Sequence, residues 1–341
     1  MIAWFNEDIE CHGWGDYLCT QRLILTHNYG MKRVLIVGYG DIAMRIALIL
    51  TGRYRVLGLL RNAVRFAELR AAGVTPLLGD LDAKISLCRL AGLAHIVLHF
   101  APPPAIGESD TRTRNLLNIL SRGTLPDTFI YISTSGVYGD CEGDRVAETR
   151  MVNAQTVRAR RRVSAEHQIR SWARRTGVRV IILRVPGIYA ADRLPLQRLR
   201  QGTPVIMATE DGYTNHIHAD DLARAVVAAL RFGRSGRLYH ISDDSELKMG
   251  DYFDCVADTI GLIRPPRVSR EQAQRVLPNA LLAFVNESRR LVNKRMKCEL
   301  RLMLLYPTIL DGLRIVQQYR PNTFLTGMRT RLRRAIGLFF G

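Results

Sequence analysis

A glycine-rich turn between an apolar run and an amphipathic segment constrains this chain more than any other feature. Residues 32–45 read KRVLIVGYGDIAMR, in which the apolar run 34–37 breaks at Gly38 and Gly40. Apolar residues then recur at helical spacing, at Ile42, Ala43, Ile46, Ala47 and Leu50. An apolar run bounded by glycine indicates a buried strand, so this segment predicts a strand, a tight turn and a helix.

The turn also has the spacing of a loop that binds a pyrophosphate. We expect Gly38 to allow the tight bend, Gly40 to let backbone N–H groups approach the phosphates, and Ala43 to pack where helix meets strand. Asp41 and Ile42 complete the turn at the helix N-terminus, whose positive dipole end would face the phosphates. The alternative is a glycine turn of an α/β protein that binds no ligand.

Strand and helix patterns alternate from residue 31 to residue 185. The expected strands cover residues 34–37, 55–59, 74–78, 95–100, 129–133 and 179–184, with helices between them, including one over residues 83–90. This alternation predicts an α/β fold of the Rossmann type, a doubly wound parallel sheet with helices on both faces. Ligands of such sheets bind beyond the carboxyl ends of the strands.

The rest of the chain divides into three less regular parts. Residues 186–318 predict a smaller, discontinuous substrate region with some elements that return to the sheet, and residues 270–310 read as helix punctuated by proline. Residues 1–30 read as an N-terminal extension. Residues 319–341 form a basic amphipathic tail that would dock on its own domain, fray or contact a membrane surface.

The formal net charge is +18, yet only five of the cations are lysine. The densest cluster, Arg158 to Arg162, has no interleaved aromatic residue and matches no nucleic-acid motif, so we expect a solvated face or an anion-binding wall there. No apolar run reaches the roughly 18 residues of a membrane span. The six cysteines are scattered, which is typical of reduced thiols, and we expect a cytoplasmic protein without a metal site.

Four segments together resemble the extended and atypical short-chain dehydrogenase/reductases, the superfamily that includes NAD(P)-dependent sugar epimerases and dehydratases. They are the glycine turn, ISTSGVYG at residues 132–139, LRVPGIY at 183–189 and HIHADDLA at 216–223, in the family's order and at its spacing. The resemblance implies a serine or threonine that contacts the substrate carbonyl, a tyrosine that transfers a proton, and a lysine four residues after the tyrosine. Thr134 matches the hydroxyl position. His218 matches a family histidine that is not a metal ligand.

The tyrosine–lysine pair of that family has no counterpart here. None of the twelve tyrosines is followed by a lysine four residues later. When Glu166 is aligned with the glutamate of the family's Y-x-x-x-K-x-x-x-E, Arg158 takes the tyrosine position and Arg162 the lysine position. The family's chemistry needs such a pair, because a tyrosine with a pKa of about 10 is a poor base until a nearby cation favours its phenolate.

Three interpretations of this departure remain open. Arg162 could supply the positive charge and bind the nicotinamide ribose, although its planar guanidinium does not copy an ammonium group. Tyr138, four residues after Thr134, could transfer the proton. The third interpretation is a protein that binds the cofactor without turning it over, as a sensor or an assembly module.

The cofactor preference rests on the end of the second expected strand. NAD-binding members of this fold place an acidic residue there, whereas no acid occurs between Arg53 and Ala67 and Arg61 could neutralise a 2′-phosphate. We therefore expect NADP, with NAD as the alternative. By resemblance, Asp80 would contact adenine and the backbone at Ala101 would pass the cofactor.

These features together predict an NADP-binding oxidoreductase, epimerase or dehydratase that exchanges hydride at a hydroxyl or carbonyl carbon. Its substrate would be a small molecule similar to a nucleotide sugar, and a homodimer is compatible with the pattern. The catalytic candidates are Thr134, Tyr138 and Arg162.

Overall fold

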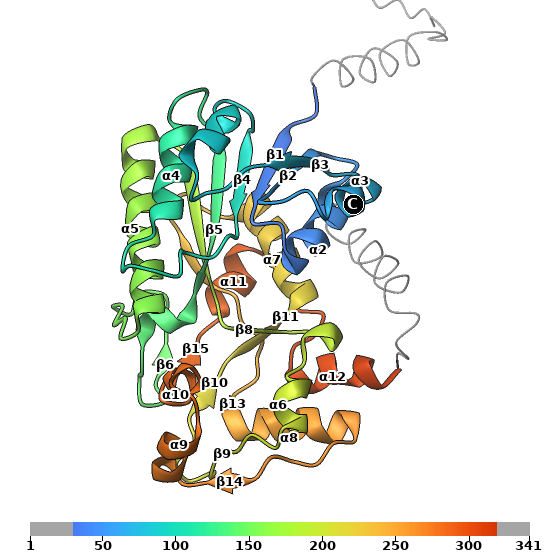
Figure 1. Ribbon diagram of the computed structural model, residues 1–341, viewed down its shortest axis with the longest axis vertical. Helices are drawn as coiled ribbons and strands as arrows, with labels where there is room; N and C mark the ends of the chain where they lie inside the picture. Colours follow the sequence, from blue (N-terminus) through green and yellow to red (C-terminus); the bar gives the residue numbers. More distant parts are fainter. Residues whose placement is uncertain (1–29, 319–341) are drawn as a thin grey trace, which may run out of the picture.

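The computed structural model describes residues 30–318, whose centre is a seven-stranded sheet (Figure 1). The expected tail at 319–341 and all of the expected extension except Gly30 lie outside the described residues. The strand order is β12-β7-β5-β4-β1-β2-β3, and every neighbouring pair is parallel. The strands are β1 (Arg33–Val37), β2 (Arg55–Leu60), β3 (Thr75–Leu78), β4 (Ile96–His99), β5 (Thr128–Thr134), β7 (Arg179–Val185) and β12 (Leu238–His240).

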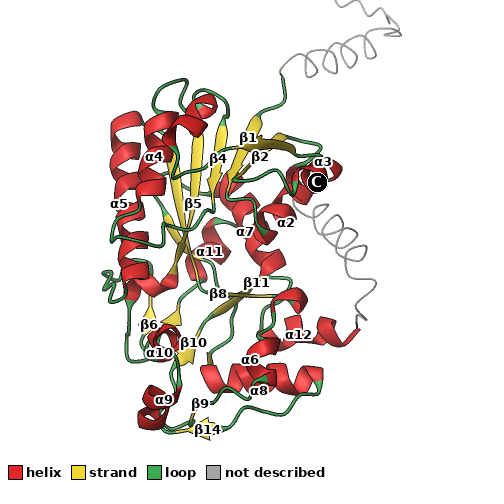
Figure 2. Cartoon of the chain, in the orientation of Figure 1, coloured by secondary structure: helices red, strands yellow, loops and turns green. Residues whose placement is uncertain are grey.

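The central strands are apolar on both faces because helices cover both. Along β1, Val34 and Ile36 pack into one core and Leu35 and Val37 into the other, and all four are fully buried. The first core contains α2 (Asp41–Leu50), α7 (Ala219–Phe232) and part of α11 (Lys294–Glu299). The second contains α4 (Thr111–Leu120) and α5 (Val157–Thr176) (Figure 2). The predicted Rossmann-type doubly wound sheet is therefore confirmed.

Two connections of the sheet are shorter than a regular helix. Between β2 and β3, α3 covers only Phe66–Ala71. The helix expected over residues 83–90 is instead a 3₁₀ segment, η1 (Lys84–Leu90). Ser86 Oγ donates to the carbonyl of Ala83 at 2.7 Å and accepts from the Asp80 amide at 2.9 Å. Such local side-chain bonds compete with α-helical pairing, which accounts for the tighter turn.

A smaller region lies beyond the carboxyl ends of the sheet, below it in Figure 1. Its strands form short pairs, β8 (Gly187–Tyr189) with β11 (His216–His218), β9 (Val205–Ile206) with β14 (Arg267–Val268), and β10 (Tyr213–Thr214) with β13 (Leu247–Lys248). The 3₁₀ segment η3 (Ala191–Arg193) follows β8, and α6 (Leu196–Arg200), α8 (Met249–Ile260) and α12 (Ile309–Gln318) supply the helices. Their apolar side chains form a separate core. Within residues 30–318, no helix has the length and apolar character needed to cross a membrane.

The chain after residue 270 differs from the helix expected there. The helices α9 (Arg270–Val276) and α10 (Asn279–Val285) are followed by β15 (Arg290–Leu291), which pairs in parallel with β6 (Arg145–Val146). The Arg290 amide donates to the Asp144 carbonyl, and the Val292 amide to the Val146 carbonyl, both at 2.9 Å. The expectation of helix was wrong for this segment, because pairing with a distant loop satisfies its backbone groups instead.

Candidate functional site

The glycine turn joins β1 to α2 and lies against the chain that leaves β4. Gly38 has a φ of +89°, and a Cβ placed there would lie 2.4 Å from the Ala101 nitrogen, so only glycine fits without displacement. Gly40 precedes α2 with an ordinary φ of −97°, no side chain caps the helix, and a Cβ at Gly40 would meet nothing within 4 Å. The first N–H groups of α2 are therefore not capped by a side chain, which leaves them available to a phosphate.

The turn forms one wall of a cavity of about 390 Å³ at the carboxyl edge of the sheet. Of the predicted cofactor residues, the cavity brings together Gly38, Gly40, Arg61, Asp80 and Ala101. Ala43 is buried behind the turn, and Ile42 packs partly against the same core. The chain thus builds a continuous surface from the glycine turn to the end of β2, where a dinucleotide of this fold class would place its adenosine half.

Two further arginines line this cavity, and the sequence did not single them out. Arg65 binds both carboxylate oxygens of Glu68, at 2.6 and 2.8 Å, and donates to the Tyr39 carbonyl at 3.0 Å. Arg112, at the start of α4, binds Asp82 at 2.6 Å. These ion pairs lower the pKa values of Glu68 and Asp82. Arg112 lies about fifty residues from Arg61 in the chain, so only the parallel sheet brings the two together.

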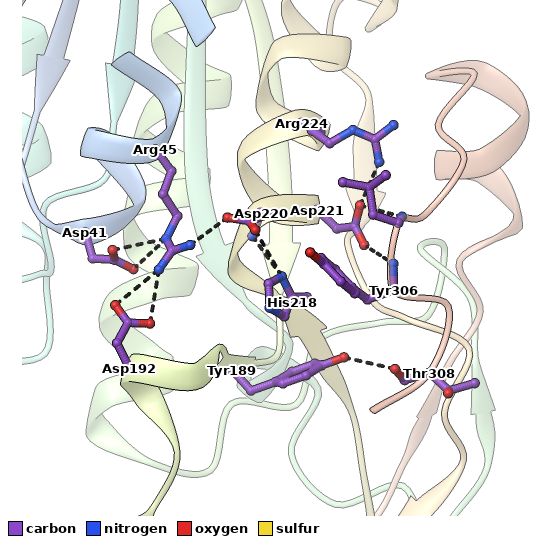
Figure 3. Close-up of polar contacts among 11 residues, drawn as sticks. Asp41, Arg45, Tyr189, Asp192, His218, Asp220, Asp221, Arg224, Tyr306 and Thr308 are labelled. Atoms are coloured by element: carbon purple, nitrogen blue, oxygen red, sulfur yellow. Dashed lines mark hydrogen bonds and ion pairs between the residues drawn. The ribbon is translucent and has the colours of Figure 1, made fainter. Parts of the chain in front are cut away.

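Asp41 belongs to an ion cluster around the buried Arg45 rather than to the cavity wall (Figure 3). Its carboxylate binds Arg45 Nε at 3.1 Å and Arg193 Nη1 at 3.2 Å. The Arg45 side chain is 1% exposed and also binds Asp220 at 2.6 Å and Asp192 at 3.1 Å. One arginine on α2 thereby ties the glycine turn to the start of α7 and to η3.

The histidines of β11 have structural partners. His218 Nδ1 accepts from the Asp220 amide at 3.2 Å and so caps α7, and its ring contacts Tyr306 with 3.9 Å between centroids. Burial lowers the pKa of His218 to about 4, which keeps the ring neutral. His216 stacks on Tyr252 with 4.1 Å between ring centroids. Both rings thus pack among aromatic side chains of the smaller region.

Thr134 is the last residue of β5, at the carboxyl edge of the sheet. It is half-buried, and its Oγ1 accepts from the Gly136 amide at 3.2 Å. The bond starts the 3₁₀ segment η2 (Ser135–Tyr138). The hydroxyl proton is not used in that bond, so Thr134 retains a donor for a substrate oxygen.

Tyr138 is 1% exposed, and its hydroxyl lies 2.6 Å from His240 Nε2. His240 Nδ1 lies 3.1 Å from the Val292 carbonyl, which can only accept. The ring must therefore carry its proton on Nδ1, so Nε2 accepts from the Tyr138 hydroxyl. Burial lowers the pKa of His240 to about 3 and raises the pKa of Tyr138. Because the Tyr138 hydroxyl already donates its proton to His240, this bond argues against Tyr138 as the proton donor to a substrate.

The register of α5 against the sheet is set by Glu166. Its carboxylate accepts from Ser133 Oγ at 2.6 Å and from Arg184 at 2.7 Å, and both charged side chains are 4–5% exposed. One turn earlier, Arg162 Nη1 donates at 2.9 Å to the Tyr131 hydroxyl and the Ile132 carbonyl of β5. Arg162 therefore lies beside β5, as expected for the lysine position, although its described bonds go to the fold itself. Arg158 comes one turn earlier again, near the end of β5.

Comparison with known proteins agrees with this architecture. The family described as "NAD dependent epimerase/dehydratase family" matches residues 44–242, more than half of the chain. A dTDP-glucose 4,6-dehydratase of Mycobacterium tuberculosis is 27% identical over 222 residues, 59% of this chain and 63% of that protein. The chain thus spans less than two thirds of that relative. A GDP-6-deoxy-D-mannose reductase of Pseudomonas aeruginosa is 24% identical over 220 residues, 58% of this chain and 72% of the relative.

Solved structures extend the likeness over most of the described chain. A functionally unknown conserved protein from Silicibacter pomeroyi is 28% identical, with a TM-score of 0.71 over 84% of this chain and 99% of that one. The dTDP-glucose 4,6-dehydratase DesIV of Streptomyces venezuelae, solved with NAD and TYD bound, has a TM-score of 0.69 at 22% identity, over 85% of this chain and 98% of its own. At that identity the second likeness concerns the fold alone.

Proposed function

Because the chain belongs to the NAD dependent epimerase/dehydratase family, we propose that it binds NADP(H) in the cavity beside the glycine turn. The observation that carries the cofactor choice is Arg61, which lines the same cavity as the turn and stands where NAD-binding members place an acid. Arg65 and Arg112 line the same cavity, each already paired with a carboxylate. The guanidinium group of Arg61 would favour a 2′-phosphate over a 2′-hydroxyl.

The chain's own residues would orient this cofactor. Gly38 and Gly40 would admit the pyrophosphate to the N–H groups of α2, and Asp80 would face the adenine. Asp80 is preorganised for that role, since its carboxylate accepts from the Asp82 amide at 3.0 Å. When bound, the nicotinamide would supply hydride exchange at a hydroxyl or carbonyl carbon.

For the reaction itself, we propose Thr134 as the hydroxyl that contacts the substrate oxygen and Arg162 as the positive charge beside it. The curated relatives act, by their names, on dTDP-glucose and GDP-6-deoxy-D-mannose. A nucleotide-sugar-like small molecule is accordingly the substrate class that we propose first.

A second candidate function is a sensor that binds NADP(H) without turnover. It is favoured by two observations: the Tyr138 hydroxyl is already donated to His240, and arginines stand at positions 158 and 162. In that case the nucleotide would change the conformation or partners of the protein rather than react.

Titration of the purified chain with NADPH and with NADH tests the cofactor proposal. We expect NADPH to bind at least tenfold more tightly than NADH. Equal affinities would contradict the NADP choice, and no binding of either nucleotide would overturn both candidate functions. A screen for NADPH oxidation with nucleotide sugars and simple carbonyl compounds then separates the two. Turnover supports the enzyme, and tight binding without turnover supports the sensor.

A further inference from the structure

Four charged side chains gather where β5 ends against the first turns of α5. Arg158 and Arg162 come from α5, and Glu287 and Arg289 come from the segment between α10 and β15, which Figure 1 shows near β6 below the sheet. We call these four residues the α5 cluster. Arg158 interacts electrostatically with Arg162 and with Glu287, and Arg289 Nη1 binds Glu287 Oε2 at 2.8 Å.

The cluster borders the space beside Thr134. A Cβ placed at Gly136 would lie 3.6 Å from Thr134 Oγ1 and 3.9 Å from Glu287 Oε2. The carboxylate therefore stands on the same side of Gly136 as the hydroxyl that we propose for substrate contact. A long side chain at position 136 would fill that space.

The segment that carries Glu287 is held firmly against the loop after η2. The Ser288 amide donates to Asp140 Oδ1 at 2.8 Å, and the Ser288 carbonyl accepts from the Cys141 amide at 3.0 Å. Arg289 Nη1 donates to the Gly139 carbonyl at 2.7 Å. The Glu287 side chain is only 10% exposed, so the cluster is a built part of the fold.

The cluster carries more positive than negative charge, and some of its N–H donors have no hydrogen-bond acceptor among the described residues. Arg289 and Arg158 both interact with Glu287, the one carboxylate of the cluster, and Arg162 adds a positive charge that repels Arg158. Within residues 30–318, Arg158 forms no hydrogen bond or ion pair, and its guanidinium lies 5.6 Å from the centre of the Phe284 ring. The Nε atoms of Arg162 and Arg289 are buried without a partner among the described residues. Buried donors without partners are costly, and an added anion would satisfy them.

We propose that the α5 cluster binds an anionic group of the substrate, a carboxylate or a phosphate, between Arg158 and Arg289. This inference rests on the proposed function and narrows its substrate class to compounds that carry such a group close to the reacting carbon. Glu287 acts as the internal counter-ion of the empty cluster and competes with the substrate's anion. An arginine at the position of the family's tyrosine would thus serve binding rather than proton transfer.

The electrostatics of Arg158 agree with this assignment. Partial loss of hydration lowers its pKa, repulsion from Arg162 and Arg161 lowers it further, and Glu287 raises it. A bound anion would relieve that repulsion, whereas a cationic or neutral ligand would not.

Calorimetric titration of the full chain with malonate and with inorganic phosphate, both in the presence of saturating NADPH, tests the proposal. NADPH keeps the probes out of the cavity at Arg61. We expect R158A to weaken anion binding about tenfold, since it removes a charge-assisted contact. E287Q should tighten binding several-fold, because it removes the competing carboxylate. The matched control is R160A, because Arg160 lies on the same helix but is paired with Glu108 at 2.8 Å, and this variant should retain wild-type affinity.

Equal losses in R158A and R160A would overturn the proposal, and so would an E287Q variant that binds no more tightly than wild type. A protein that binds neither probe, with or without E287Q, would also overturn it. Preference for malonate or for phosphate identifies the carboxylate or the phosphate class. If NADPH does not bind, the proposed function fails, and the same variants are titrated without NADPH. Weaker anion binding by R158A than by R160A, with tighter binding by E287Q, would then still support the anion site. Circular dichroism melts check that each variant is folded.

Discussion

The cofactor cavity and the α5 cluster are both rich in arginine, yet they use it differently. In the cavity, Arg65 and Arg112 each bind a carboxylate of their own, Glu68 and Asp82, and each also donates to a backbone carbonyl. In the α5 cluster, the one carboxylate, Glu287, binds Arg289 and interacts electrostatically with Arg158, and Arg162 adds a third positive charge beside Arg158. The cavity is thus preorganised, whereas the cluster retains an excess of charge.

The comparison shows which part of a Rossmann-type protein tolerates change. The proposed cofactor binding would depend on backbone positions, such as the close approach of Gly38 to Ala101, and these follow from the fold. The reaction depends on individual side chains at the ends of strands and helices. The fold therefore tolerates the arginines that we align with the family's tyrosine and lysine positions, because the sheet around them does not depend on those side chains.

We expect the largest effect from G38A, which would displace the backbone that forms the cavity wall and so lower both stability and NADPH binding. A Cβ at this position would lie 2.4 Å from the Ala101 nitrogen and require a left-handed φ, so we expect destabilisation by about 2–4 kcal/mol and loss of NADPH binding. Urea unfolding and NADPH titration measure the two effects. G40A is the control, because its Cβ meets nothing and its stability should stay near wild type. A stable, NADPH-binding G38A protein would contradict the cradle.

R45M tests the connection between the sheet and the smaller region. It would leave Asp41, Asp192 and Asp220 without their shared cation, and breaking such a buried pair costs about 3–5 kcal/mol. We expect a loss near the lower end in urea unfolding, because Asp192 is 43% exposed. R193A removes a more exposed partner of Asp41 and should cost less than about 1 kcal/mol. Similar losses in the two variants would show that Arg45 does not organise the cluster.

R61A sharpens the contrast within the cavity. We expect NADPH affinity to fall about tenfold or more, because a charge-assisted contact to the 2′-phosphate is lost, while NADH affinity changes little. Fluorescence titration of both nucleotides measures this difference. Equal losses for NADPH and NADH would refute the assignment of Arg61 to the 2′-phosphate.

Y138F examines the reaction side. We expect a loss of stability of about 1 kcal/mol, because His240 Nε2 is left without its donor. Any hydride-transfer rate should be retained, whereas T134V should lower it with little change in stability. A Y138F protein of unchanged stability and lost activity would instead support Tyr138 as the proton donor.

The effect that is smallest near neutral pH, and that grows as the pH falls, concerns the neutral histidines of the two regions. Burial lowers the pKa of His99, beside the cavity, and of His240, beside Tyr138, to about 3. Between a pH of about 6.5 and a pH of about 3, His99 and His240 are protonated in the unfolded chain but neutral in the folded chain. The free energy of unfolding therefore falls with decreasing pH, by about 1.4 kcal/mol per pH unit for each histidine. H99Q and H240Q should each lower that slope, measured by urea unfolding at several pH values, by about one proton. An unchanged slope would mean that the ring is protonated in the folded state.

Much of the fold could be predicted because it depends on local pattern. The apolar run before Gly38 and the helical spacing after it predict β1 and α2, and alternation predicts the parallel sheet. The failure at residues 286–293 has the opposite cause. This segment has no partner nearby in sequence, and only its pairing with the loop at Asp144 and Val146 makes it a strand.

The candidate site divides in the same way. The residues of the glycine turn, with Arg61 and Asp80, could be singled out from spacing, and they line one cavity. Arg65, Arg112, Glu287 and Arg289 carried no signal of their own, since an isolated arginine or glutamate reads as a surface residue. The hydrogen bond between Tyr138 and His240 could not be predicted either, because the two residues lie about a hundred positions apart in the chain.

By itself, the sequence determined the Rossmann-type sheet and the place of the glycine turn between β1 and α2, because both follow from short-range patterns of apolar residues and glycine. By resemblance, it also predicts that Arg158 and Arg162 stand at the family's tyrosine and lysine positions. Only the tertiary structure decided which charges meet. Neutralisation depends on distances between atoms from remote segments, and these distances decide that Arg65 and Arg112 of the cavity are paired while Arg158 has no ion partner among the described residues.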